Sequence, residues 1–113
     1  MPRDPRAYLW DARQAAERVV EFVAGRTWQE YAGDVLLRSA VERQFEIVGE
    51  ALNKLRAADD AIAAEIADLP RIVAFRNLLI HGYATIDDAL VWEIATERAE
   101  LLVATLKRLL GEG

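Results

Sequence analysis

The residues of this chain that are best suited to chemistry lie together in the stretch RNLLIHGY, at positions 76–83. This stretch contains Arg76, Asn77, Tyr83 and the single histidine of the chain, His81. A histidine titrates near neutral pH and can take a proton from the 2′-hydroxyl of RNA or give one to the leaving oxygen. An arginine can hold the phosphate and stabilise the negative charge that develops on it. These side-chain types therefore fit the cleavage of an RNA phosphodiester bond.

The spacing places these groups near one end of a predicted helix. Residues four apart lie one above the other on a helix, so the Asn77 amide can hold the His81 ring in one orientation and tautomer. Gly82 is typical of a helix end, where glycine tolerates a left-handed backbone, and Tyr83 follows at the start of the turn. On spacing alone, a structural interpretation is favoured. A histidine in the last turn interacts favourably with the helix dipole, and an arginine nearby can pair with a carboxylate.

The composition gives little support to other kinds of catalytic site. The chain has no cysteine, which excludes disulfides, a thiolate nucleophile and cysteine-ligated zinc. One histidine and scattered carboxylates offer no metal cluster, so we expect neither a metal nor another cofactor. Paired acid–base catalysis usually needs two proton-transferring groups, and one chain supplies only one histidine. A two-fold homodimer that joined two copies of the helix end would supply a second His81 and a second Arg76.

The overall composition is that of a soluble globular protein. With 113 residues, 53% of them hydrophobic and 29% charged, the sequence suits a single domain over residues 1–113. The net charge of -5 argues against a broad basic surface, so contact with RNA must be local. The start, MPRDPRAYLW, has no apolar signal core, and no stretch is apolar for long enough to span a membrane. We therefore expect a cytoplasmic protein.

Apolar residues recur at helical spacing along most of the chain and predict an all-α bundle. We expect longer helices over about 5–24, 35–57 and 70–80, and a last one capped by Thr85 or Asp87. A short helix is expected in DDAIAAEIAD, and a loop in RTWQEYAGD. The predicted bundle therefore has four longer helices and a short one. Its predicted core positions outside the second helix are Leu9, Ala12, Ala16, Val19, Val23, Ile72, Val73, Phe75, Leu79, Leu90, Val91, Ile94, Leu102, Leu106 and Leu109.

The second predicted helix, which Asp34 caps, is apolar on two sides. One stripe consists of Leu37, Val41, Phe45, Val48, Leu52 and Leu55, and the other of Leu36, Ala40, Ile47 and Ala51. The first stripe suits the core, whereas the second needs a further helix, which a second copy of the chain can supply. Gly49 costs about 1 kcal/mol relative to alanine inside this helix, which indicates close approach of a neighbouring backbone. A polar set of Glu42, Glu46, Glu50 and Asn53 is best interpreted as a solvated face, with a role in lining a site as the alternative.

Three stretches of the sequence resemble HepT-like toxins of the HEPN superfamily. Arg76, His81 and Tyr83 look like the R-x4-H-x-Y signature of that family. RSAVERQFEIVGEAL is similar to its second-helix segment, and FRNLLIHGY followed by IDDALVW is similar in content and order. The resemblance extends over roughly residues 30–95, so it is more specific than the short pattern alone.

This resemblance implies a HEPN-type helical bundle that forms a homodimer with the motif in an interface cleft. It also implies a metal-independent endoribonuclease, the toxin of a type VII toxin–antitoxin system, whose partner is a minimal nucleotidyltransferase antitoxin. By the same resemblance Arg76 holds phosphate, His81 is the general acid–base and Asn77 supports them. Tyr83 is the residue to which the antitoxin transfers AMP. The added nucleotide would place negative charge and bulk where the RNA phosphate must sit.

Two alternatives remain open at this stage. The chain can be a non-catalytic helical binding partner or substrate of a nucleotidyltransferase, which needs the Tyr83 hydroxyl but not the His81 imidazole. It can also be a structural helical dimer in which Arg76 and His81 pair with carboxylates. Burial of both side chains away from any cleft would support the structural dimer.

Overall fold

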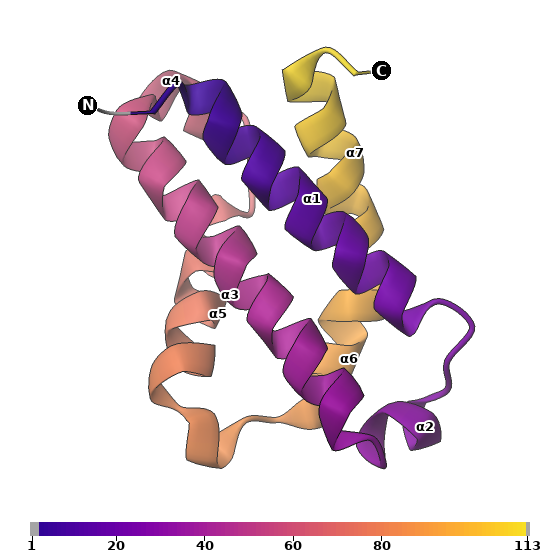
Figure 1. Cartoon of the computed structure of the whole chain (residues 1–113). Helices are drawn as coiled ribbons and strands as arrows, with labels where there is room; N and C mark the ends of the chain where they lie inside the picture. Colours follow the sequence, from indigo (N-terminus) through magenta and orange to yellow (C-terminus); the bar gives the residue numbers. More distant parts are fainter. Residues whose placement is uncertain (1–2, 113) are drawn as a thin grey trace.

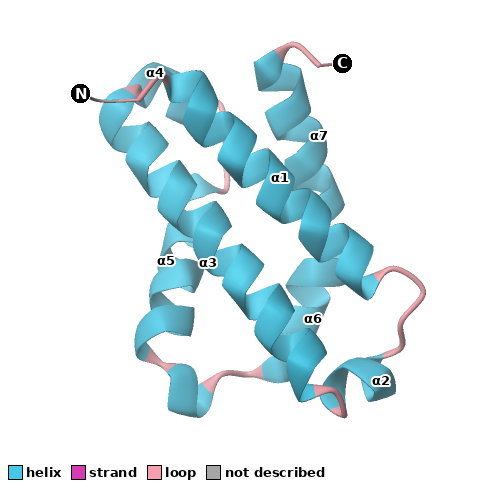
Figure 2. Ribbon diagram, in the orientation of Figure 1, coloured by secondary structure: helices cyan, strands magenta, loops and turns pink. Residues whose placement is uncertain are grey.

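The computed structural model describes residues 3–112, apart from the side chain of Tyr83 (Figure 1). Over this range the chain forms α-helices, one 3₁₀ turn and connecting loops, without a β-strand (Figure 2). The prediction of an all-α fold is therefore confirmed. None of the described helices combines the length and the apolarity that crossing a membrane requires.

The helices pack as a bundle around one central helix. The longer elements are α1 (Pro5–Val23), α3 (Val35–Ala58), α5 (Leu69–His81), α6 (Asp88–Glu97) and α7 (Ala99–Leu110). The short ones are α2 (Trp28–Ala32), α4 (Asp60–Ala63) and the 3₁₀ turn η1 (Tyr83–Thr85). The central helix α3 contacts both α1 and α5, and α7 lies along α1 (Figure 1). The end of α5 and the loop to α6 lie at the opposite end of the bundle from the two chain ends (Figure 1).

Aspartates begin α1, α3, α4 and α6 by accepting hydrogen bonds from backbone amides that have no partner inside the helix. Asp34 Oδ1 accepts from the Leu37 amide at 3.0 Å, which confirms the predicted cap of α3. Asp87, rather than Thr85, caps α6, because its Oδ1 accepts from the amides of Ala89 and Leu90. These caps fix where the loop after α5 joins the rest of the fold.

The core divides into two clusters along the bundle. The predicted stripe of α1 and the first predicted stripe of α3 are buried without exception. One cluster joins Leu9, Leu52 and Leu106 at the end of the bundle that carries the termini. The other joins Val41, Leu79 and further residues at the end that carries the RNLLIHGY stretch. Both ends of α5 are therefore held against the same helix, α3.

The predicted loop over residues 26–34 is wrong in its middle, where α2 forms. Thr27 Oγ1 accepts from the Glu30 amide at 3.1 Å, and Glu30 Oε1 accepts from the Thr27 amide at 2.9 Å. This reciprocal capping box starts a helix of only five residues. Tyr31 then anchors it, because its ring is fully buried between Trp28 and Trp92. Tertiary packing thus stabilises a helix that is too short to form alone.

The number of helices also differs at the C-terminal side, where one helix was predicted and two form. The chain breaks at Arg98, so Val91 and Ala95 pack in one core cluster and Leu106 packs in the other. Leu90, a predicted core residue, is 38% exposed, because α6 turns it away from the cluster that holds Val91.

The residues of the second apolar stripe of α3 differ in how far they are buried. Ala51 is buried, whereas Leu36, at the start of the helix, is 78% exposed. Ala40 and Ile47 are half-buried. The stripe is therefore covered within the chain only toward its C-terminal end.

Candidate functional site

Helix α5 divides the polar residues of the RNLLIHGY stretch between two of its sides. Successive residues on a helix turn by about 100°, so Arg76 projects onto the same side as the buried Val73 and Leu79. This side faces α3, and Arg76 is accordingly half-buried. Asn77 and His81 are rotated about the helix axis by about 100° and 140° from Arg76, and both are exposed. The arginine therefore starts from the packed side of the helix, and the histidine from the open side.

A short hydrogen bond carries the arginine head toward the open side. Arg76 Nη1 donates to Asn77 Oδ1 at 2.7 Å, a distance typical of a charge-assisted bond. Arg76 Nε is buried and has no hydrogen-bond partner among the residues that the structure describes. Unpaired buried donors are uncommon in folded proteins and occur at functional sites. The result is a guanidinium held at the edge of the helix, one turn before His81.

The contact of Asn77 differs from the one expected. We expected its amide to orient the His81 ring four residues on, but its oxygen accepts from Arg76 instead. A charged donor forms a strong hydrogen bond with an amide oxygen, which favours the contact with the Arg76 guanidinium. Neither Arg76 nor His81 belongs to an ion pair within residues 3–112. The alternative is a structural dimer in which Arg76 and His81 pair with carboxylates. Pairs of this kind within one chain therefore give it no support.

Gly82 ends α5, as predicted, but not in the predicted conformation. Its φ is -104°, which residues other than glycine also adopt. The need for glycine comes from contact, since a Cβ here would lie 2.8 Å from the Leu78 carbonyl oxygen. The Gly82 amide donates to the same oxygen at 2.7 Å. The backbone of Tyr83 begins η1 directly afterwards, while its side chain lies outside the described part of the chain.

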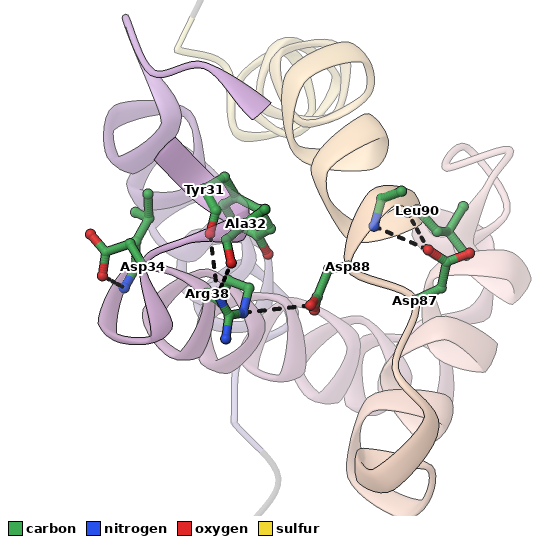
Figure 3. Close-up of polar contacts among 9 residues, drawn as sticks. Tyr31, Ala32, Asp34, Arg38, Asp87, Asp88 and Leu90 are labelled. Carbon is green, nitrogen blue, oxygen red and sulfur yellow. Dashed lines mark hydrogen bonds and ion pairs between the residues drawn. The ribbon is translucent and has the colours of Figure 1, made fainter. Parts of the chain in front are cut away.

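A second polar cluster holds the far end of the loop that carries Tyr83. Arg38 donates to the carbonyl oxygens of Tyr31 and Ala32, and its Nε lies 3.5 Å from Asp88 Oδ2 (Figure 3). One guanidinium thus joins the end of α2, the first turns of α3 and the start of α6. The loop is fixed by α5 on one side and by this cluster on the other. Sequence analysis missed the cluster, although the T-x-x-E spacing of Thr27 and Glu30 was a usable signal for α2.

Burial shifts the ionisation of two groups beside this cluster. The Tyr31 hydroxyl is buried and has no partner within the described residues. Burial, and then the negative charge of Glu42, raise the pKa of Tyr31 above its usual value. Burial, and then the negative charge of Asp88, likewise raise the pKa of Glu42. Glu42 is therefore not simply part of a solvated face.

The other members of the predicted polar face of α3 fit that interpretation better. Glu46 pairs with Arg43 at 3.3 Å, and Glu50 pairs with Lys54 at 3.2 Å. Asn53 Oδ1 accepts from the Arg56 guanidinium at 2.7 Å. All three partners belong to α3 itself, so these groups form a surface network along one helix.

A mostly apolar groove of about 270 Å³ lies beside α5. Phe45 and Val48 of α3, Ile72 and Phe75 of α5, and Leu102 of α7 line it. Neither Arg76 nor His81 is among its lining residues, so the groove and the polar stretch are separate features. Within residues 3–112, no three His, Cys, Asp or Glu side chains gather in a way that could hold a metal ion.

Comparison with known proteins gives one family over most of the chain. The family model described as "Ribonuclease HepT-like" matches residues 12–109. A protein of Methanocaldococcus jannaschii described as a candidate RNase is 35% identical over 97 residues, which cover 84% of this chain and 86% of that protein. A candidate RNase of Caldanaerobacter subterraneus subsp. tengcongensis is 28% identical and covers 96% of each chain. A "Probable ribonuclease HepT" of Thermococcus cleftensis is 28% identical over 96% of this chain and 98% of that one. No solved structure matches the chain significantly.

Proposed function

The chain belongs to the ribonuclease HepT-like family of the HEPN superfamily, and from this premise we propose that it is a metal-independent endoribonuclease. Arg76 and His81 form its active site, and Asn77 supports them. The observation that carries the assignment is the 2.7 Å bond that holds the Arg76 head at Asn77, one helical turn before the exposed His81. The descriptions of three relatives as ribonucleases support the same activity.

The proposed reaction uses the 2′-hydroxyl of the substrate as the nucleophile. The 2′-oxygen attacks the adjacent phosphorus while the bond from phosphorus to the 5′-oxygen breaks. A neutral imidazole takes the proton of the 2′-hydroxyl, and a protonated imidazole gives one to the leaving 5′-oxygen. The products are a 2′,3′-cyclic phosphate and a 5′-hydroxyl. Arg76 donates to the non-bridging oxygens, on which negative charge develops.

A homodimer completes this site, because each chain supplies one histidine and the reaction needs two proton transfers. The open side of α5 carries Ala74 and Leu78 beside Asn77 and His81, and Leu78 is 47% exposed. Small and apolar residues around a polar pair suit a two-fold helix contact. Such a contact would place two copies of Arg76 and His81 around one phosphate, and the paired arginines would attract RNA to a chain of net charge -5.

The activity is restrained by modification of Tyr83 in a type VII toxin–antitoxin system of the cytoplasm. A minimal nucleotidyltransferase antitoxin makes the tyrosine oxygen attack the α-phosphorus of ATP, which releases pyrophosphate and leaves AMP on the ring. Tyr83 follows His81 by two residues, so the added phosphate would compete for Arg76. The backbone turn of η1 and the Arg38–Asp88 pair keep this loop close to the end of α5.

The net charge of -5 favours one alternative, a binding partner of the nucleotidyltransferase that does not cut RNA. Nucleases usually approach RNA with a basic surface, and this chain places Asp87 and Asp88 in the segment after the motif. The alternative needs the Tyr83 hydroxyl and does not need the His81 imidazole.

Cleavage of a tRNA and mRNA mixture in the presence of a chelator tests the proposal. The proteins compared are the unmodified dimer, His81→Ala and Arg76→Ala, with intact masses measured first to exclude added AMP. Arg71→Ala is the matched control, because Arg71 is an exposed arginine of the same helix outside the motif. We expect cyclic phosphate ends from the wild type and from Arg71→Ala, and none from the other two. A folded, unmodified dimer without activity would favour the binding partner.

A further inference from the structure

We propose that Gly49 of α3 is a positioning residue for Arg76, because the absence of a side chain at this position sets where the guanidinium can lie. The inference rests on the proposed function for its catalytic consequence, but its structural part stands on contacts alone. Nothing in the RNLLIHGY stretch identifies Gly49, which lies 27 residues earlier in the chain.

The contact between the two residues is direct and closer than ordinary packing. A Cβ built on Gly49 would overlap Arg76 Cβ and would lie 2.6 Å from Arg76 Cγ. Its distance to the Ile72 carbonyl oxygen would be 3.4 Å, which is an ordinary van der Waals contact. The stem of Arg76 therefore occupies the space that any other residue at position 49 would fill. The sequence predicted close approach of a neighbouring backbone at Gly49, but the atoms that approach most closely are the Arg76 side-chain carbons Cβ and Cγ.

Both ends of the arginine side chain are thus fixed by different partners. The backbone of α3 at Gly49 leaves the space that Cβ and Cγ occupy, and Asn77 fixes the head through the 2.7 Å bond to Nη1. Nε lies between these two points and is buried without a hydrogen-bond partner in the described part of the chain. An arginine has many rotamers in solution, and loss of this freedom before binding lowers the cost of holding a phosphate.

Glycine has a low helix propensity, so the effect of a substitution at position 49 on helix propensity can be separated from its effect on the contact with Arg76. Alanine is preferred over glycine inside a helix, so a Gly49→Ala change should raise stability if nothing touches position 49. If Arg76 occupies the space, the same change should lower stability and displace the guanidinium. Whether Gly49→Ala raises or lowers the free energy of unfolding therefore shows whether Arg76 occupies the space at position 49.

A double-mutant cycle with Arg76→Gly tests the contact without an assay of activity. The cycle compares urea unfolding midpoints of the wild type, Gly49→Ala, Arg76→Gly and the double variant. Arg76→Gly removes both carbons that the new Cβ would meet and leaves only the ordinary contact with Ile72. We expect Gly49→Ala to lower the midpoint beside Arg76 and to leave it unchanged or raise it beside glycine. Should Gly49→Ala fail to fold, recovery of the fold in the double variant supports the proposal. An equal effect in both backgrounds, or failure of both variants to fold, overturns it.

Two further readouts separate positioning from a general loss of packing. Leu55→Ala is the matched control, since Leu55 is a fully buried residue of α3 that lies six positions after Gly49. In ¹⁵N-labelled protein, the Arg76 Nε–H signal should shift and lose exchange protection in Gly49→Ala but not in Leu55→Ala. The kcat of RNA cleavage per folded molecule should fall at least tenfold in Gly49→Ala and stay within twofold in Leu55→Ala.

The outcomes separate this inference from the proposed function. If the wild type cuts no RNA, the proposed ribonuclease fails, while the unfolding cycle and the Nε–H signal still decide whether Gly49 positions Arg76. If the wild type cuts RNA and Gly49→Ala keeps both its kcat and its Nε–H signal, the positioning role is overturned and the ribonuclease stands.

Discussion

Replacement of Arg76 by methionine should abolish RNA cleavage and leave the protein at least as stable as before. Methionine keeps the two carbons that pack on Gly49 and has nearly the same helix propensity as arginine. It removes the buried Nε, which has no partner among the described residues, and the bond from Nη1 to Asn77. The variant thus separates the packing of the side chain from its charge.

The expected gain follows from two opposing terms. Removal of an unpaired buried donor relieves about 1–3 kcal/mol. Loss of the hydrogen bond from the charged guanidinium to the exposed Asn77 costs about 1.5 kcal/mol, the low end for a charged donor. The balance is a rise of about 0.5 kcal/mol in the free energy of unfolding, or about 2 °C in Tm for a chain of this length. A functional residue that lowers stability in this way is common at active sites.

Urea unfolding and the cleavage assay measure the two effects on one protein preparation. Arg71→Met is the control, because the same change at the exposed Arg71 removes no buried donor and should shift the midpoint little. A drop of more than 1 kcal/mol in Arg76→Met would refute the reasoning, since it would mean that the guanidinium stabilises the fold. Retained cleavage would refute the assignment of Arg76 to the active site.

The remaining predictions concern the surroundings of the motif. Tyr31→Phe should raise the free energy of unfolding by about 1 kcal/mol at pH 7, because it removes a buried hydroxyl without a partner in the described structure. The gain over the wild type should grow by roughly 1.4 kcal/mol between pH 9 and pH 11, since the pKa of Tyr31 is raised in the folded state and only the unfolded chain ionises near its usual value of 10.0. Glu42→Gln should stabilise the protein at pH 7 and lose this advantage below pH 4.5, because the raised pKa of Glu42 penalises only its charged form; unfolding midpoints at both pH values check the sign. Gly82→Ala should cost about 1–3 kcal/mol, because its Cβ would lie 2.8 Å from a backbone oxygen. Gly33→Ala, where that distance is 3.3 Å, should cost less in the same unfolding assay. Asn77→Ala should lower kcat about fivefold, the equivalent of about 1 kcal/mol, with little change in the unfolding midpoint.

Helix positions were predictable because the signals that set them are local. The predicted bounds of α1, α3 and α5 agree with the structure within one residue at each end. Aspartate caps and apolar spacing act over a few residues, so the sequence contains all of the information. The break at Arg98 was not predictable in this way, since apolar residues continue at helical spacing across it. At the break the chain passes from the core cluster that holds Val91, Ala95 and Ala99 toward the cluster that holds Leu106, and this division of the core is a property of the whole fold.

The positions of the proposed site residues along α5 were predictable, but their contacts were not. Sequence spacing correctly places Asn77 and His81 on one side of α5, yet it predicted a contact between these two residues, whereas Asn77 contacts Arg76. Spacing along a helix predicts contacts only between residues of that same helix. The position of Arg76 on the side that packs on α3 depends on which side of α5 is buried, and that follows from the tertiary structure.

The placement of Arg76 on the packed side explains why the motif alone cannot define the site. An arginine on the open side of α5 would lie in water, free to adopt many rotamers and screened from the phosphate that we propose it holds. This placement buries Nε without a partner among the described residues, which costs stability, but it confines the head of Arg76 to the edge of the helix beside Asn77. This arrangement requires that the facing helix leave room for the stem, and Gly49 provides that room. A chain that kept Arg76, His81 and Tyr83 but carried a larger residue at position 49 would therefore retain the motif and lose the geometry.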